Sequence, residues 1–178
     1  MLRRMLMGLG FAAAVSGASL AGSSPQFSFG SIDGGVIDLA AFAGKPVLVV
    51  NTASRCGFVG QFDGLQALQD RFGPRGLTVI GVPSNSFRQE LGSGGAVKEF
   101  CEMNFGIDFP MTEIVDVIGR DAHPFYSWAR EQGVAPRWNF YKILLDGEGR
   151  IAESFGTTVS PQSPKVIAAI EALLPAPE

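Results

Sequence analysis

Two cysteines and a Trp-Asn pair are the residues of this 178-residue chain whose types and positions could do chemistry. Cys56 lies in the polar stretch NTASRCG (51–57), between an apolar run and a helical pattern. A thiol near a helix N-terminus and beside a cation such as Arg55 has its thiolate stabilised by unpaired backbone N–H groups and positive charge. Since the thiolate is the nucleophilic form, we interpret Cys56 as a reactive thiol rather than a small core residue.

The second cysteine, Cys101, lies within a helical pattern further along the chain, and three interpretations of it stay open. It could be a resolving thiol that condenses with a sulfenic acid on Cys56 before irreversible oxidation. It could instead form a static disulfide with Cys56, which an oxidising compartment favours. It could also simply pack in the core. We favour the resolving role.

Trp138 and Asn139 supply an indole N–H and a side-chain amide. Both are hydrogen-bond donors that can stabilise a thiolate or a developing oxygen anion without competing as bases. His123 precedes Pro124 at a predicted helix start, so we interpret it as structural. One histidine, two distant cysteines and no clustered carboxylates are too few ligands for a metal site. We therefore expect no metal and no bound cofactor, and redox chemistry on the protein's own sulfur.

Strands and helices must bring these residues together. The apolar runs 46–50 and 77–82 are typical of strands buried on both faces, and the first should lie in mid-sheet. Apolar residues at helical spacing separate the two runs, and Gly73-Pro74 ends that helix. A strand, a helix and a strand in this order predict a parallel pair joined by a right-handed crossover. The residues of the helical face are Phe62, Leu65, Leu68 and Phe72.

The rest of the chain continues to alternate. The further expected elements are a hairpin at 27–29 and 36–39, a helix around 97–105, a short strand at 114–117, a helix around 125–129, a hairpin at 140–145 and 151–155, and a helix from Ser163 and Pro164 to Leu174. Parallel strands, a final hairpin and helices on both faces predict an α/β thioredoxin-like fold, with a central mixed sheet flanked by helices.

The N-terminal segment 1–21 has two arginines, a short apolar stretch and then small residues. This pattern predicts a cleavable secretory signal followed by one domain at 22–178, and a secreted or periplasmic location. An uncleaved anchor is the alternative, but the apolar stretch is shorter than the roughly 20 residues that a span needs. The net charge of -3 and the scattered basic residues argue against a nucleic-acid partner.

Several motifs together resemble the glutathione peroxidases, over about residues 27 to 174. They are NTASRCG (51–57), PSN (83–85), QE (89–90), DFPM (108–111) and WNF (138–140). The resemblance implies a thioredoxin-like fold and places Cys56 where the family has its peroxidatic selenocysteine or cysteine. It also matches Trp138 and Asn139 to two catalytic partners. Cys101 matches the resolving cysteine of the members that thioredoxin reduces.

Two departures from the family pattern bear on function. Ser86 stands where the family commonly has a catalytic glutamine, and the segment before Gln89 is one residue shorter. The stretch between His123 and Trp138 is too short for the insertion that builds the subunit contact of oligomeric members. We therefore expect a monomer, and we assign Ser86 no firm role.

The resemblance implies a thiol peroxidase that reduces hydrogen peroxide or organic hydroperoxides, with a thioredoxin-like dithiol or glutathione as reductant. A disulfide exchanger would need a second cysteine where Val59 stands. A peroxiredoxin would have threonine where Ala53 stands. A non-catalytic thioredoxin-fold binding or chaperone module, with a structural disulfide, is the alternative from another functional class.

Overall fold

A four-stranded mixed sheet in the order β4-β3-β5-β6 lies at the centre of the computed structural model, which describes residues 26–175. Strand β3 pairs in parallel with β4 and antiparallel with β5, and all its residues are buried. The parallel pair and the mid-sheet position of this strand were predicted, and both are confirmed. The strands are β3 (Val47–Thr52), β4 (Thr78–Pro83), β5 (Lys142–Leu145) and β6 (Ile151–Phe155).

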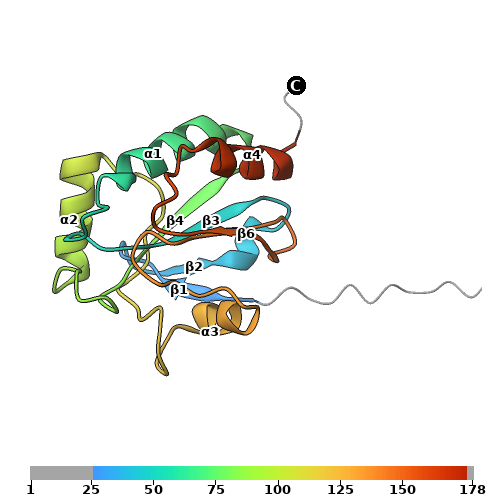
Figure 1. Ribbon diagram of the computed structural model, residues 1–178. Helices are drawn as coiled ribbons and strands as arrows, with labels where there is room; N and C mark the ends of the chain where they lie inside the picture. The colour runs from blue at the N-terminus through green and yellow to red at the C-terminus, as the bar shows by residue number, and fades with distance from the viewer. Residues whose placement is uncertain (1–25, 176–178) are drawn as a thin grey trace, which may run out of the picture.

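Helices cover both faces of the sheet, as Figure 1 shows. Helices α1 and α4 lie above it in this view with α2 at the left, while α3 and the small antiparallel sheet of β1 and β2 lie below. The bounds are β1 (Ser28–Gly30), β2 (Val36–Asp38), α1 (Gln61–Phe72), α2 (Gly94–Phe105), α3 (Pro124–Glu131) and α4 (Pro164–Leu173), with short 3-10 helices η1 (Leu39–Phe42) and η2 (Gly73–Arg75). This is the predicted α/β thioredoxin-like architecture.

Successive residues of β3 enter two separate apolar cores, because side chains alternate across a strand. Leu48 and Val50 pack with α1, α2 and α4, whereas Val47 and Val49 pack with α3 and the β1-β2 hairpin. The first core also contains both cysteines. The two thiols therefore lie on the same side of the sheet.

Local capping chemistry fixes where the helices begin. The Ser163 hydroxyl accepts a hydrogen bond from the Val166 N–H, and Pro164 occupies the first turn of α4, as predicted. Helix α2 is capped in the same way by Ser93. His123 caps α3 with its Nδ1 atom and contacts the Ser28 carbonyl through Nε2, which agrees with its structural interpretation.

The predicted strand at 114–117 is wrong. The chain forms only isolated bridges earlier, where Met111 pairs with Gly81 and Thr112 pairs with Ser31. One bridge partner lies in β4 and the other directly after β1, so no continuous ladder forms there. The hairpin predicted at 140–145 and 151–155 is confirmed, but its first strand begins at Lys142. Phe140 lies outside this strand because its φ of 60° departs from extended geometry.

The predicted signal at 1–21 lies outside the described residues. Within 26–175, each helix is too short or too polar to cross a bilayer.

Candidate active site

Cys56 lies in the turn-rich loop that follows β3 and leads into α1. Its side chain is buried, and its Sγ accepts a hydrogen bond from the Phe58 N–H at 3.5 Å. A backbone donor at this position can stabilise a thiolate without introducing a base. The neighbouring Arg55 side chain is exposed, and its backbone N–H donates to the Gln89 carbonyl at 2.9 Å.

A single residue, Gln89, links Asn139 to this loop. Its Nδ2 donates to the Gln89 Oε1 at 2.9 Å, and the same Gln89 holds the backbone of Arg55. Asn139 is fully buried, yet its Oδ1 has no hydrogen-bond partner among residues 26–175. Gln89 thus links Asn139, through its side chain, to the residue before Cys56, through its backbone, and sequence analysis assigned Gln89 no role.

Asn51, the fifth residue of β3, holds the segment 138–141 beside the cysteine loop. Its Nδ2 donates to the Trp138 carbonyl at 3.1 Å, and its Oδ1 accepts from the Tyr141 N–H at 3.2 Å. Its carbonyl accepts from the N–H of Phe140, whose left-handed φ of 60° is rare for a bulky residue. Asn51 was visible in the sequence motif, but only its distant partners reveal its positioning role.

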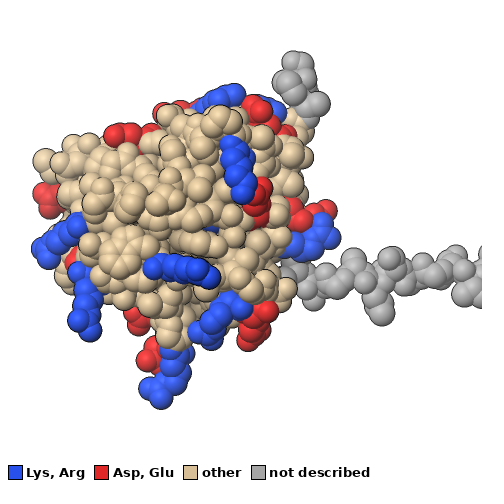
Figure 2. All heavy atoms as spheres, in the orientation of Figure 1, with Lys and Arg blue, Asp and Glu red and all other residues tan. Residues whose placement is uncertain are grey.

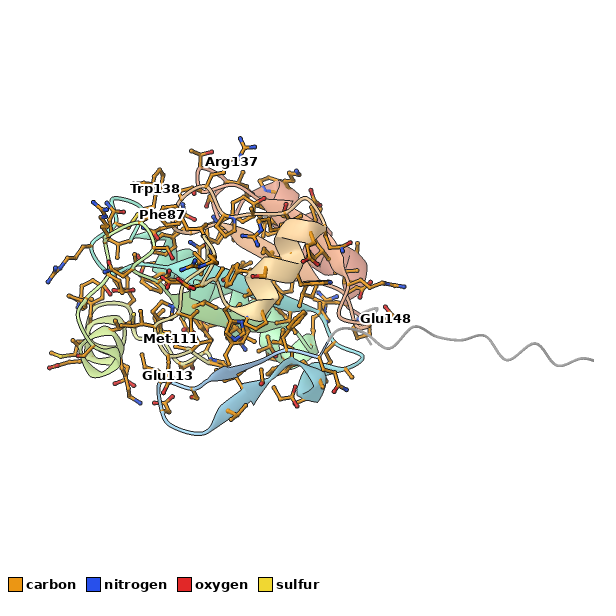
Figure 3. The ribbon with its side chains drawn as sticks, turned by 90° about the horizontal axis from the view of Figure 1, so that it is seen from below. Phe87, Met111, Glu113, Arg137, Trp138 and Glu148 are labelled. Carbon is orange, nitrogen blue, oxygen red and sulfur yellow. The ribbon has the colours of Figure 1, made fainter. Side chains whose placement is uncertain are left out.

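Trp138 lies at the surface of the site, with 40% of its area exposed. Its ring packs against Phe87, with ring centroids 5.3 Å apart. Figure 3 shows Trp138, Phe87 and Arg137 together at one edge of the molecule. Phe58, two residues after Cys56, is also exposed. We call these three aromatic residues, Phe58, Phe87 and Trp138, the aromatic rim, because each lies within two positions of Cys56, Gln89 or Asn139 in the chain.

Within residues 26–175, Ser86 makes no hydrogen bond to Cys56 or Asn139. Its hydroxyl donates to the Asp116 carboxylate and accepts from the Ser84 hydroxyl and the Val117 N–H. All three bonds are 3.0 to 3.2 Å long, and they connect the loop of Ser86 to the distant segment 116–117. The glutamine whose side chain contacts the Asn139 amide is Gln89.

Cys101 lies fully buried in α2, and both cysteines are free thiols. Burial, together with the nearby carboxylates of Glu90 and Glu102, raises the pKa of Cys101 to about 12. Glu90 also accepts a hydrogen bond from the Ser54 N–H in the cysteine loop at 3.0 Å. One buried carboxylate therefore contacts the Cys56 loop and acts on Cys101, which is protonated at neutral pH in this conformation.

Lys142 is a buried cation beside the site. Its Nζ donates to the Gln61 Oε1 at 2.5 Å, the Phe140 carbonyl at 2.8 Å and the Val159 carbonyl at 2.7 Å. Burial lowers its pKa to about 8. The three acceptors belong to the start of α1, the segment before β5 and the loop before α4, so this side chain ties three parts of the site's framework together.

Other features lie apart from this site. A cavity of about 350 Å³ between η1 and the β5-β6 turn contains neither cysteine, and Glu148, which lines it, lies far from Trp138 in Figure 3. Charged side chains are interspersed with uncharged surface on the face that Figure 2 shows. Among residues 26–175, His, Cys, Asp and Glu form no group of three that could hold a metal ion.

Comparisons with known proteins agree on one family. The family model for glutathione peroxidase matches residues 25–130. The hydroperoxy fatty acid reductase gpx1 of Synechocystis sp. is 43% identical over 160 residues, which cover 83% of this chain and 94% of the relative. The glutathione peroxidase-like peroxiredoxin GPX5 of Chlamydomonas reinhardtii is 37% identical over 150 residues, which cover 79% and 93%.

Solved structures with similar folds include a glutathione peroxidase and a thiol:disulfide interchange protein. The crystal structure of T. cruzi GPX1 is 30% identical, has a TM-score of 0.63, and matches 83% of this chain and 91% of its own. A putative thiol:disulfide interchange protein DsbE from Chlorobium tepidum also has a TM-score of 0.63, over 85% and 94% of the chains. At 19% identity, the second similarity concerns the thioredoxin-like fold alone.

Proposed function

The chain belongs to the glutathione peroxidase family and is a thiol peroxidase, and we propose that Cys56 is the residue that attacks the peroxide. The Cys56 thiolate attacks one oxygen of the hydroperoxide, and an S–O bond forms as the O–O bond breaks, so that Cys56 becomes a sulfenic acid. The other oxygen leaves and takes up a proton to give water or an alcohol. Asn139 and Trp138 supply the donors that stabilise the leaving oxygen anion. The link from Asn139 through Gln89 to the Cys56 loop is the observation that carries this proposal.

Cys101 is the proposed resolving thiol. It attacks the sulfenic sulfur of Cys56, the hydroxyl leaves as water, and a disulfide forms. The raised pKa of Cys101 means that a buried thiol would react slowly, because the thiolate is the nucleophile. We therefore propose that α2 opens locally after Cys56 is oxidised, which exposes Cys101 and lets the two sulfur atoms meet.

The proposed substrate is an organic hydroperoxide with an apolar chain and an anionic group. The aromatic rim of Phe58, Phe87 and Trp138 suits an apolar chain. Arg55, Arg88 and Arg137 adjoin this rim in sequence, and each is exposed without an ion pair to a described residue. The Synechocystis relative is named a hydroperoxy fatty acid reductase, which agrees with this chemistry.

The proposed reductant is a thioredoxin-like dithiol, because relatives with this sequence pattern are named peroxiredoxins and because Cys101 can form the disulfide that a dithiol reduces by exchange. Glutathione is the other reductant to test. We further propose that the segment 1–21 directs the protein to a secreted or periplasmic location, and that the mature domain is a monomer without nucleic-acid or stable membrane contacts.

A steady-state assay tests the reaction and both cysteines. Hydroperoxide consumption by the mature protein is coupled to a thioredoxin system, and then to glutathione. We expect turnover with thioredoxin that is lost in Cys56→Ser and falls at least about tenfold in Cys101→Ser. Full thioredoxin-linked turnover in Cys56→Ser would show that Cys56 is not the peroxidatic residue. Full turnover in Cys101→Ser would show that Cys101 is not needed for reduction and only packs in the core.

A pair of charge-reversal variants tests the substrate proposal. Arg137→Glu should raise the KM for a hydroperoxy fatty acid and leave the KM for hydrogen peroxide unchanged, because only the fatty acid carries a carboxylate. Lys45→Glu makes the same charge change beside the distant cavity and serves as the matched control. Equal effects of the two variants on the KM for the fatty acid would argue against recognition of its carboxylate by the arginines beside the aromatic rim.

A further inference from the structure

We propose that Glu90 is the general base of the resolving step, and that it takes the proton from the Cys101 thiol as its sulfur attacks the oxidised Cys56. The inference rests on the proposed roles of the two cysteines. It gives a chemical function to a buried carboxylate that the reduction of the peroxide does not use.

Glu90 has an acceptor atom in the core that no described residue uses. Its side chain is only 6% exposed, and its Oε1 accepts from the Ser54 N–H at 3.0 Å and from the Leu91 N–H at 2.8 Å. Its Oε2 is also buried, and within residues 26–175 this atom has neither a hydrogen-bond partner nor an ion pair. Burying a carboxylate oxygen without a partner costs free energy, so it calls for a functional explanation.

The position of Glu90 connects the surroundings of the two cysteines. Through the Ser54 N–H it holds the loop two residues before Cys56. Burial and the charge of this carboxylate together raise the pKa of Cys101, so the carboxylate also lies near the second thiol. Helix α2 begins only at Gly94, after Glu90 in the chain. The carboxylate therefore stays on the Cys56 loop when α2 opens and Cys101 approaches.

A base at this place supplies what the buried thiol lacks. Cys101 must lose its proton to attack, because the thiolate is the nucleophile. The Glu90 Oε2 accepts this proton as the S–S bond forms and the S–O bond of the Cys56 sulfenic acid breaks. The departing hydroxide then takes the proton from Glu90, so water leaves and the carboxylate is restored. The Cys101 sulfur is oxidised and the Cys56 sulfur is reduced, without a further reactant.

The direction of one rate change separates a base from a purely electrostatic neighbour. If the Glu90 carboxylate only opposed ionisation of Cys101, its removal would lower the pKa of this thiol and speed disulfide formation. If the carboxylate is the base, its removal slows the same step. Glu102 is exposed on α2 and, like Glu90, adds to the effect of burial on the pKa of Cys101. Glu102→Gln is therefore the matched control.

The test follows disulfide formation after one equivalent of hydrogen peroxide in the mature parent protein, Glu90→Gln, Glu90→Asp and Glu102→Gln. Glutamine keeps the oxygen that accepts from Ser54, and aspartate keeps a carboxylate. Cys56 oxidation is measured separately in the same proteins with Cys101→Ser, together with the unfolding midpoint. The equilibrium for opening of α2 precedes the proton transfer, so the two factors multiply in the observed rate.

We expect Glu90→Gln to slow disulfide formation at least about tenfold, while Cys56 oxidation changes less than about twofold. Glu90→Asp should keep more of the rate, and Glu102→Gln should not slow the step. Between about pH 6 and pH 8 the rate in Glu90→Gln should rise about tenfold per pH unit, because only thiolate already present can attack, whereas the parent rate should rise less. The other charged groups beside Cys101 are the same in both proteins; they are Asp33, Lys98, Glu102 and Asp108.

Disulfide formation in Glu90→Gln at or above the parent rate would overturn the inference, as would an equal slowing in Glu102→Gln or parallel pH profiles. Equal losses in Cys56 oxidation and in disulfide formation would show that Glu90 only supports the loop. A parent protein whose Cys56 is oxidised but never joins Cys101 would instead contradict the proposed resolving role.

Discussion

At the scale of single residues, the groups that contact the Cys56 sulfur and the Asn139 amide are neutral, whereas the charged Glu90 and Lys142 hold the surrounding backbone. The Cys56 Sγ accepts from a backbone N–H, and Asn139 presents an amide held by Gln89. Asn51 holds the segment that carries Trp138 and Asn139. Neutral donors stabilise negative charge on sulfur or oxygen without taking up a proton, so the site can serve both the thiolate and the leaving oxygen.

Asn51→Ala should lower the free energy of unfolding by about 2 kcal/mol, because the Trp138 carbonyl and the Tyr141 N–H lose their partner. It should also slow Cys56 oxidation, since Asn139 is no longer held in place. Chemical denaturation and single-turnover kinetics measure the two effects. Asn104→Ala removes an exposed asparagine that bonds within α2 and should change the free energy of unfolding by less than about 0.5 kcal/mol. Similar effects of both variants would remove the special role of Asn51.

At the scale of elements, α2 holds Cys101 in the core, so the proposed resolving step depends on this helix. The helix begins at the Ser93 cap and ends at Gly106, whose φ of 59° suits a left-handed C-terminal cap. While α2 is folded, Cys101 is buried and its pKa is raised to about 12. The stability of this helix therefore sets the rate at which the proposed disulfide forms.

Two substitutions in α2 should change that rate in opposite directions. Ser93→Ala removes the cap, costs the helix about 1 kcal/mol, and should speed disulfide formation about fivefold. Gly95→Ala favours the helix, has open space for its Cβ, and should slow the same step. Stopped-flow measurement of disulfide formation after peroxide addition checks both. Equal rates in the two variants would contradict local opening of α2 as the controlling step.

Lys142 connects the start of α1, the segment before β5 and the loop before α4. Burial of its ammonium group costs free energy of folding. Burial lowers its pKa to about 8 from the ordinary 10.5, so between these values the unfolded chain binds more protons than the folded one. The contribution of Lys142 to stability should therefore rise as pH increases from about 8 to about 10.5. Below pH 8 its cost is fully present and independent of pH.

The measurement is the difference in unfolding free energy between the parent and Lys142→Met over this pH range. Because the other titrating groups are the same in both proteins, their contributions cancel. We expect the parent to gain stability relative to the variant as the pH rises. Lys142→Met should itself be less stable by about 3 kcal/mol at neutral pH, since three buried acceptors lose their donor. A difference that stays flat from pH 8 to 10.5 would mean that Lys142 titrates normally.

At the scale of the whole molecule, the periodicity of apolar residues predicted most of the fold. Continuous apolar runs gave β3 and β4, helical spacing gave α1, and cap residues gave the start of α4. The strand expected at 114–117 was wrong because Pro110 and Met111 contact β4 at Gly81, and Thr112 then contacts Ser31 of a different segment. Such a change of partner depends on tertiary contacts and leaves no period in the sequence.

Sequence analysis identified only those site residues whose side-chain type indicates a chemical role. Cys56, Cys101, Trp138 and Asn139 stood out for this reason, although their roles remain predictions. Gln89, Asn51 and Lys142 have ordinary side chains, and their importance lies in partners 50, 87 and 81 positions away along the chain. The fold brings these positions together at the end of β3. A single sequence does not show which residues far apart in the chain come into contact.

The most direct test of the account is to trap the sulfenic acid. The parent, Cys101→Ser and Cys56→Ser proteins receive one equivalent of hydroperoxide in the presence of dimedone, and peptide mass spectrometry locates the adduct. We predict an adduct on Cys56 that is strongest in Cys101→Ser, a Cys56–Cys101 disulfide in the parent, and a reduced Cys101 in Cys56→Ser. An adduct on Cys101, or peroxide consumption that leaves Cys56 as a free thiol, would contradict the assignment of Cys56 as the peroxidatic residue.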